Sequence, residues 1–538
     1  MKRKILENTD IDWFEVVFRA LFFGIKALSF APRNMTLSLS VESLLRGTFA
    51  HIPAQGKLEI LNNWLVAIDI SGHIVHFDHA QSEKSVELIR FYDGLVIAIP
   101  PGSFILPTFT DLHLHAPQFL YQGTGLDLPL LEWLHRYAFK AEEKLDTDPE
   151  LARKVYRRLA DSLLKAGTGT VCLFGTLKAE TNLVLAEEME AAGVRAFVGK
   201  VSMDISSRPS YVEASASAAI DAARAFGEQI DGKFSSSRSR PPLVQPVITP
   251  RFVPTCSDEL LHGLGVLSEQ KGWRVQSHMA ESSDQVEWHN LLTSRTIQAH
   301  CTFLSAHAAP SNTNHSNSLV QPPESNQFSH LHTLGTSIAH CPLSNIYFSP
   351  THAFSLREAL EAKVKVGLGT DIAGGYNLDI MNAMRNAVAV SRVREGQREK
   401  ERILWKAEPG SELRSEPSGA EAHFESPPPG KSLAIDWKES LFLATVGGAQ
   451  ALGIESGMFR VGALFDAQQI KLFDKDTGVG VGALNFFELE MEMEKQVGEI
   501  SERDRMSVMS EEMIEQWWCI GDQKNRTQMW VQGIKCLE

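Results

Sequence analysis

Eight short apolar runs separated by helical segments constrain the fold of this chain more than any other feature of its sequence. Short apolar runs that alternate with helical periods indicate βα units and a parallel sheet, so the expected class is α/β. Eight parallel strands can close into a (β/α)₈ barrel, although an open doubly wound sheet fits the same pattern. The runs are SFILPTFTD, GTGTVCLFG, VRAFVGKVS, LVQPVITPR, WRVQSHMA, TIQAHC, GTSIAHC and KVGLGTD.

Both ends of the chain carry short alternating runs that are typical of antiparallel strands. Those near the start are TLSLSVESLLRGTF, LEILNNWLVAID, GHIVHF and LVIAIP, and those near the end are GALFDAQQIKLFD and TQMWVQGIKCL. We therefore predict an accessory β-sandwich built from residues 35–103 and 462–538, beside a barrel over residues 104–461. Residues 1–34 are expected to form a disordered or helical extension.

Two segments within the barrel region have the composition of insertions. Residues 305–327 and 396–430 are rich in Pro, Ser, Asn or charge. They offer too few apolar side chains to offset the entropy lost on ordering. We expect both to be flexible loops.

Charge and cysteine content exclude several classes of function. The net charge of −14, with no basic stripe, would repel a polyanion, so no nucleic-acid partner is expected. Six cysteines without a Cys-x-x-Cys pair disfavour a disulfide framework and predict a reducing, cytoplasmic location. The apolar stretch Trp13–Phe30 is interrupted by Glu15, Arg19 and Lys26, so we expect no spanning helix and no membrane partner.

The motif Asp-Leu-His-Leu-His places His113 and His115 at the end of the first barrel strand. Residues two apart on a strand point to the same side, so the two imidazoles can bind one metal ion. On its own, the motif is equally compatible with two surface histidines. Support must come from the rest of the chain.

Three further polar residues end later apolar runs: His278, His300 and Asp371. Barrel active sites form at the C-terminal ends of the strands, so these side chains are expected to meet the two histidines there. Nitrogen and oxygen ligands suit Zn²⁺, and Fe²⁺ stays open. An open coordination position would lower the pKa of bound water to about 7. The predicted ligands are His113, His115, His278 and Asp371.

Two residues have a catalytic and a structural interpretation. Glu281 follows His278 by three residues and could move protons between water, a ring nitrogen and a leaving amine. It could equally be a carboxylate that stabilises the start of a helix. His300 could assist the attacking water, or it could be a structural histidine that orients a neighbour.

The chain resembles the metal-dependent amidohydrolase superfamily, and within it the guanine deaminases. The segment that is similar to the distinguishing block of guanine deaminases is PTFTDLHLHAPQFLYQGTGLDLPLLEWLHRYAFKAEEKL. Four later blocks follow in the same order: TPRFVPTCS, VQSHMAESSDQVE, SIAHCPLSN and VGLGTDIAGGYNLDIMNAMR. The resemblance spans roughly residues 44–482.

The resemblance implies a reaction and an assembly. It implies hydrolysis of guanine to xanthine and ammonia, in purine catabolism or salvage, by a homodimer. One zinc per subunit would be held by the four predicted ligands. Asp371 would accept the proton of the attacking water, and Glu281 would protonate the purine ring.

The resemblance also implies substrate contacts. Arg251 and Phe252 would contact guanine, as would Gln118 in the turn after His115. A guanidinium facing the exocyclic oxygen and an amide facing the pyrimidine edge would favour guanine over adenine. From the residues alone, Arg251 could form a surface salt bridge and Phe252 could pack in the barrel. The implied substrate-side set is His115, Ala116, Pro117, Gln118, Arg251, Phe252, His278, Glu281 and Asp371.

Three features bear on this interpretation. A binuclear variant of the superfamily has a lysine at the end of the fourth strand, whereas here Arg251 stands there and Lys200 ends the third, which favours one metal. The stretch between His278 and His300 is shorter than relatives usually have, and an insertion follows Leu304. Rival functions are deamination of another heterocycle, such as a pterin, an adenine derivative or a triazine, and a catalytically silent barrel scaffold.

Overall fold

The computed structural model describes residues 41–234, 240–279, 291–304, 326–349, 352–407, 431–474, 477–484 and 508–537. The predicted extension at 1–34 lies outside this part of the chain. So do most of the predicted insertion at 305–327 and residues 408–430 of the second one.

Eight parallel strands form the barrel in the order in which they occur along the chain. A doubly wound sheet would have a different strand order, so the (β/α)₈ prediction is confirmed. A two-residue strand, β9 (Val201–Ser202), extends the pairing with the fourth of these strands. The eight are β6 (Phe109–His115), β7 (Thr168–Phe174), β8 (Arg195–Gly199), β10 (Val244–Pro250), β11 (Arg274–Met279), β12 (Thr296–His300), β13 (Ser337–His340) and β14 (Lys365–Leu368).

Backbone hydrogen bonds join the last strand region to the first at the C-terminal mouth. The amide of Asp371 donates to the carbonyl of His113 at 2.8 Å, and the amide of His115 donates to the carbonyl of Ile372 at 3.0 Å. The chain just after β14 is therefore held against β6. Three of the predicted metal ligands, His113, His115 and Asp371, take part in this closure.

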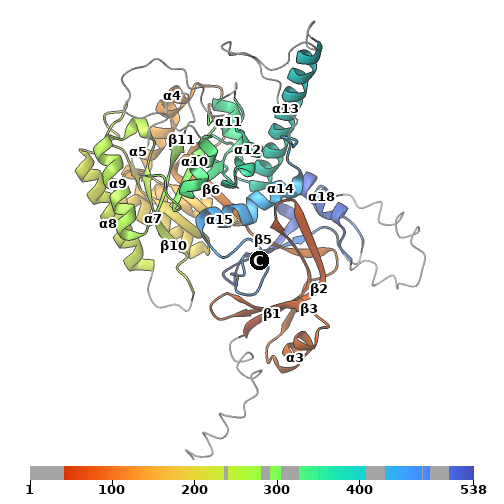
Figure 1. The fold of residues 1–538 in the computed structure, drawn as a ribbon. Coiled ribbons are helices and arrows are strands. Elements are labelled where there is room, and N and C mark those ends of the chain that lie inside the picture. The colour runs from red at the N-terminus through yellow and green to blue at the C-terminus, as the bar shows by residue number, and fades with distance from the viewer. Residues whose placement is uncertain are drawn as a thin grey trace, which may run out of the picture.

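Helices surround the barrel, and several begin at a side-chain cap (Figure 1). The Asp148 side chain accepts from the Leu151 amide at the start of α6, and Pro149 is its first residue. The helices up to β14 are α4 (Leu130–Trp133), α5 (Phe139–Thr147), α6 (Pro149–Lys165), α7 (Ala179–Ala192), α8 (Ala216–Phe234), α9 (Asp258–Lys271), α10 (Gln327–Leu334), α11 (Pro342–Phe348) and α12 (Leu356–Glu361). Later come α13 (Ile380–Ala407), α14 (Trp437–Phe442), α15 (Gly448–Leu452) and α18 (Glu511–Ile520).

The longest of these helices, α13, corrects part of the prediction for residues 396–430. The helix continues to Ala407 and projects from the body of the molecule (Figure 1). Residues 396–407 are therefore helical, because Arg, Lys and Glu favour a helix even where little packs against it. Among the described residues, no helix is both long and apolar enough to cross a membrane.

The second sheet takes strands from both ends of the chain, as predicted. Its central strand β1 pairs antiparallel with β2 but parallel with β4 and β5, so the sheet is mixed rather than purely antiparallel. It extends to Pro107, because the first apolar run supplies β5 to this sheet and β6 to the barrel. The strands are β1 (Val41–Ala54), β2 (Lys57–Asp69), β3 (Ile74–His79), β4 (Val96–Ala98), β5 (Ser103–Pro107), β15 (Ala467–Lys471), β16 (Arg526–Val531) and β17 (Ile534–Leu537), and α3 (Glu83–Phe91) follows β3.

A buried ion pair links the barrel to this sheet. Arg195 at the start of β8 donates to both carboxylate oxygens of Asp466, at 2.5 and 3.1 Å. Asp466 directly precedes β15 and also accepts from Ser456 and from the Gln532 amide. Both partners are almost fully buried, so the pair is shielded from water.

Candidate metal centre and substrate cavity

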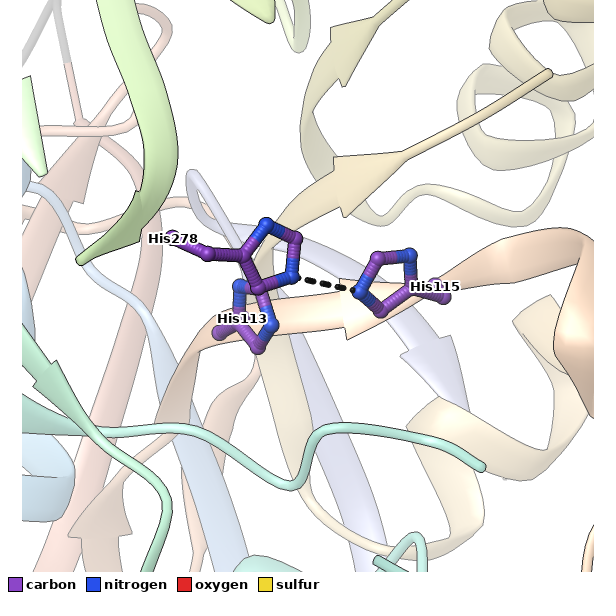
Figure 2. A group of neighbouring side chains, drawn as sticks. All are labelled: His113, His115 and His278. Atoms are coloured by element: carbon purple, nitrogen blue, oxygen red, sulfur yellow. Dashed lines mark hydrogen bonds between the residues drawn. The ribbon is translucent and has the colours of Figure 1, made fainter. Parts of the chain in front are cut away.

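The two histidines of the Asp-Leu-His-Leu-His motif lie on β6 with both side chains buried. Their ring centroids are 5.1 Å apart. His278, at the C-terminal end of β11, places its ring 4.8 Å from that of His113 and 5.1 Å from that of His115. Figure 2 shows the three imidazoles gathered around one point. The predicted convergence of these side chains is thus present in the structure.

Asp371 brings a carboxylate to the same point. Its Oδ1 lies 3.2 Å from Nε2 of His113 and 3.7 Å from Nε2 of His115. Nε2 of His115 lies 3.0 Å from Nε2 of His278. Any two ligand atoms of a tetrahedral zinc site, with zinc–ligand bonds of 2.0–2.1 Å, are about 3.3 Å apart. The three distances given are close to this value, and the ligand atoms form two groups within 4.8 Å that share His113, one with His115 and His278 and the other with His300 and Asp371.

A buried nitrogen without a hydrogen bond supports the same fit. Among the described residues, Nε2 of His113 has no hydrogen-bond partner of suitable geometry, even though Asp371 Oδ1 is close. Lone pairs of Nε2 of His113 and Oδ1 of Asp371 that face one another at this distance suit a cation bound by both atoms. The Nδ1 atom of His278 lies 2.5 Å from the carbonyl oxygen of Arg251. That contact makes Nδ1 the donor and leaves Nε2 for a metal.

Burial sets the charge of these groups. It lowers the pKa of His113, and it lowers the pKa of His115 and His278 well below the usual value of 6.5. Burial alone would raise the pKa of Asp371, but the nearby His113 and His300 lower it to about 2. Neutral imidazoles and an ionised carboxylate are the forms that bind a metal.

His300 lies at the edge of this cluster, at the end of β12. Its Nε2 is 3.9 Å from Asp371 Oδ2, and its Nδ1 is 2.9 Å from Asn345 Oδ1. Both His300 (φ 67°) and Asp371 (φ 51°) have left-handed backbone conformations. Non-glycine residues rarely adopt them, and such strain is concentrated at functional sites.

Asp111, the first residue of the motif, supports the cluster from below. Its carboxylate accepts from the Thr370 amide at 3.1 Å, from the Thr370 hydroxyl at 2.5 Å and from the His113 amide at 3.1 Å. It therefore ties β6 to the residue before Asp371. Its burial raises its pKa to about 7.

A cavity of about 330 Å³ opens beside the histidines. Its size is suitable for a small heterocycle. Apolar walls come from α4, η2 (Leu134–Ala138) and α11, and polar groups line one side. The lining residues include His115, Gln118, Trp133, Arg251, Phe252, His278, His300, Phe348 and Asp371.

The predicted substrate-side residues do not all have the same position relative to the cavity. Gln118, Arg251 and Phe252 line the cavity. Ala116 and Pro117 are buried in the 3₁₀ helix η1 (Ala116–Tyr121), next to Gln118, and are not among the residues that line this cavity. Glu281 lies outside the described residues.

Arg251 does not form the surface salt bridge considered as an alternative. It pairs with Glu142 of α5 within the protein, with Nη1–Oε2 and Nη2–Oε1 distances of 2.6 and 3.0 Å. Glu142 is fully buried and also accepts from Gln118 Nε2 at 3.2 Å. The sequence pattern could have identified Glu142 as buried, because Ala138, Ala141 and Leu145 place it on the apolar face of the helix.

Comparisons with known proteins agree with this arrangement. Residues 104–407 match the amidohydrolase family. The chain is 35% identical over 458 residues to guanine deaminase from Dictyostelium discoideum, which covers 80% of this chain and 89% of that protein. It is 32% identical over 511 residues to the Homo sapiens guanine deaminase, which covers 91% of this chain and 95% of that protein.

Solved structures resemble this fold over most of its length. The guanine deaminase from C. acetobutylicum, solved with bound guanine in the active site, has a TM-score of 0.66 and 24% sequence identity. The match covers 92% of this chain and 99% of that chain. This likeness supports the barrel and the second sheet.

Proposed function

This chain belongs to the amidohydrolase family, and we infer that it is a guanine deaminase, which hydrolyses guanine to xanthine and ammonia. The observation that carries this inference is the convergence of three buried imidazoles and one carboxylate at the mouth of the barrel. They come from strands far apart in a sequence that is similar to guanine deaminases along most of its length. The adjoining cavity fits a purine.

We propose that His113, His115, His278 and Asp371 hold one Zn²⁺ per chain. The donor set, the spacing and the charge states all suit that ion. A zinc ion at this point would make water more acidic and so supply a nucleophile near neutral pH. The protein's own groups then have to move the protons.

Asp371 is suited to take the proton from the attacking water. Its carboxylate is ionised, buried and in contact with the histidine cluster. His300 lies on its other side, 3.9 Å from Oδ2, and we propose that it orients the water or the carboxylate. Removal of this proton lets the water oxygen form a bond to C2 of the purine.

Glu281 is the proposed proton carrier on the substrate side, from its place three residues after His278. It would protonate a ring nitrogen, which makes C2 more electrophilic, and would then take the proton of the new C2 hydroxyl and pass it to the amino group. The bond between C2 and the amino nitrogen then breaks, and ammonia leaves as the C2 carbonyl of xanthine forms. The proton that Asp371 took from the water would then restore the acid form of Glu281, so the protons balance over one turnover.

Arg251, Gln118 and Phe252 are the proposed substrate contacts. The guanidinium and the amide line the cavity on its polar side and offer donors to the oxygen-bearing edge of guanine. Phe252 lies with its ring centroid 6.4 Å from that of His278 and supplies an apolar contact. Adenine carries an amino group where guanine has its oxygen, so it would leave these donors unpaired.

The test is a deaminase assay on zinc-loaded protein. Ultraviolet absorbance would follow the loss of guanine, and adenine and cytosine would serve as comparison substrates. We expect turnover of guanine and negligible turnover of the others. Bound zinc without turnover of guanine would contradict the proposed function and favour a silent scaffold.

Assembly and location are proposed from the resemblance alone. We expect a homodimer in the cytoplasm. Light scattering of the purified protein and microscopy of a tagged chain would check these two expectations.

A further inference from the structure

Two polar side chains that line the cavity share one buried hydrogen-bond partner. Among the described residues, the polar side chains that line the cavity apart from the histidines and Asp371 are Gln118 and Arg251. Both donate to the Glu142 carboxylate, which is fully buried and lies outside the lining. We propose that Glu142 is a positioning residue that fixes both side chains so that the enzyme recognises the oxygen-bearing edge of guanine. This inference rests on the proposed function.

Contacts at both ends hold the Gln118 amide in one orientation. Its Nε2 donates to Glu142 Oε1 at 3.2 Å, and its Oε1 accepts from the Ala373 amide at 3.1 Å. Loss of the Glu142 acceptor would free one end of the amide, which could then turn. The donor and acceptor that Gln118 presents to the cavity would no longer be defined.

Arg251 is held in the same way but keeps donors to spare. Its two terminal nitrogens each use one N–H on Glu142, which leaves three N–H groups of the guanidinium. The described residues provide no second acceptor for them. The guanidinium also lies over the ring of Phe139, 4.9 Å from its centroid. The two contacts together fix the plane of the group.

Charge gives Glu142 a second effect. Burial alone would lower the pKa of Arg251, but the Glu142 carboxylate raises it above its usual value. Arg251 therefore stays a cation in a buried wall without adding an unpaired charge beside the histidines. A buried cation that loses its partner is costly and tends to move toward water.

The remaining donors match one purine edge. Guanine offers O6 and N7 as acceptors, and a guanidinium can bind both, whereas adenine has a donor at position 6. An Arg251 that is free to rotate would lose this preference. The effect should therefore appear in the choice between substrates more than in the chemical step.

The test compares Glu142→Gln with the wild-type zinc enzyme on guanine and 2-aminopurine, which has the reacting amino group but no oxygen at C6. We expect the wild type to prefer guanine. In Glu142→Gln, the ratio of the two kcat/KM values should fall about tenfold or more, with zinc content unchanged. Glu142→Asp, which keeps the charge, should restore part of the ratio.

The matched control is Glu143→Gln, the next residue of α5. Glu143 accepts from Arg208 and Ser210 and lines a separate hollow of about 700 Å³. This variant should keep the wild-type ratio. Equal losses on both substrates in Glu142→Gln, or an unchanged ratio, would overturn the positioning role.

A binding measurement separates this inference from the proposed function. Hypoxanthine keeps the oxygen and purine lacks it, and neither carries the amino group that is removed. Calorimetry should give a wild-type preference for hypoxanthine that falls about tenfold in Glu142→Gln. Absence of guanine turnover in the wild type would refute the deaminase proposal, whereas an unchanged binding preference in Glu142→Gln would refute the role of Glu142.

Discussion

At the scale of single residues, the centre combines groups whose charge states complement one another. Burial keeps three imidazoles neutral, while Asp371 is ionised. The left-handed backbone at His300 and Asp371 costs roughly 1–3 kcal/mol at each position. The hydrogen bond from His300 Nδ1 to Asn345 Oδ1 and the bond from the Asp371 amide to the His113 carbonyl hold these two residues in place. The strain at His300 and Asp371 thus lowers the free energy of unfolding at the residues that we propose for metal binding and proton transfer.

Replacement of one ligand tests the metal assignment. We expect His113→Ala to lose most of its zinc and its activity, because one of four donors at a closely spaced site is removed. Elemental analysis after gel filtration measures the zinc. His330→Ala, which changes an exposed histidine of α10, should keep a full complement. Full zinc occupancy in His113→Ala would show that this imidazole is not a ligand.

The proton carrier can be tested without disturbing the metal. Glu281→Gln keeps the shape of the side chain but cannot exchange a proton, so turnover of guanine should fall by about 10²-fold or more with zinc retained. Steady-state rates together with zinc content are the measurement. Rates near those of the wild type would remove Glu281 from the mechanism.

At the scale of elements, the sequence predicted the strands well and their allocation to sheets less well. The run 103–111 reads as one strand, yet β5 joins the accessory sheet and β6 joins the barrel. Long-range pairing makes that division, and a local pattern does not contain it. The convergence of the proposed ligands was predictable because strand ends meet at one mouth, whereas the pairing of Glu142 with Arg251 was not, because more than a hundred residues separate the two.

The ion pair between the barrel and the second sheet gives a prediction at this scale. Asp466→Asn should lower the free energy of unfolding by about 3–5 kcal/mol, since it leaves Arg195 buried without a counter-charge. Urea denaturation at pH 7 is the measurement. Glu455→Gln, which removes an exposed pair with Arg460, should change stability by less than about 0.5 kcal/mol. Similar losses in the two variants would contradict a special role for the buried pair.

The same pair has a defined dependence on pH. Burial alone would raise the pKa of Asp466, but Arg195 lowers it below the usual 3.8. A depressed pKa contributes stability that is present above 3.8 and is lost as the pH falls through the folded-state value. The difference between wild type and Asp466→Asn should therefore shrink below about pH 4. A difference that grows on acidification would contradict this assignment.

At the scale of the whole molecule, the barrel and the second sheet are built around one another. The sheet takes its strands from both chain ends, and the barrel lies between them in the sequence. Figure 1 shows the sheet on one side of the barrel and α13 projecting from the body. The cavity lies at the barrel mouth, where residues from β6, β11, β12 and the segments after β10 and β14 meet.

Removal of the metal should lower the free energy of unfolding of the whole fold. Zinc that binds only the folded chain adds about 4 kcal/mol when its concentration is a thousand times its Kd. Treatment with a chelator should therefore lower the Tm, and added zinc should restore it. Calorimetry on the two forms is the measurement. An unchanged Tm would mean that the four side chains do not bind the ion tightly.

The backbone bonds between Asp371 and β6 have a consequence for biosynthesis. A ribosome makes His113 and His115 early, His278 much later and Asp371 only after all eight barrel strands. A nascent chain that stops before β14 holds three donors and lacks the carboxylate. A centre that needs all four side chains would therefore be completed only after the last barrel strand has been made, so scarcity of zinc would act on finished barrels and not on chains still being translated.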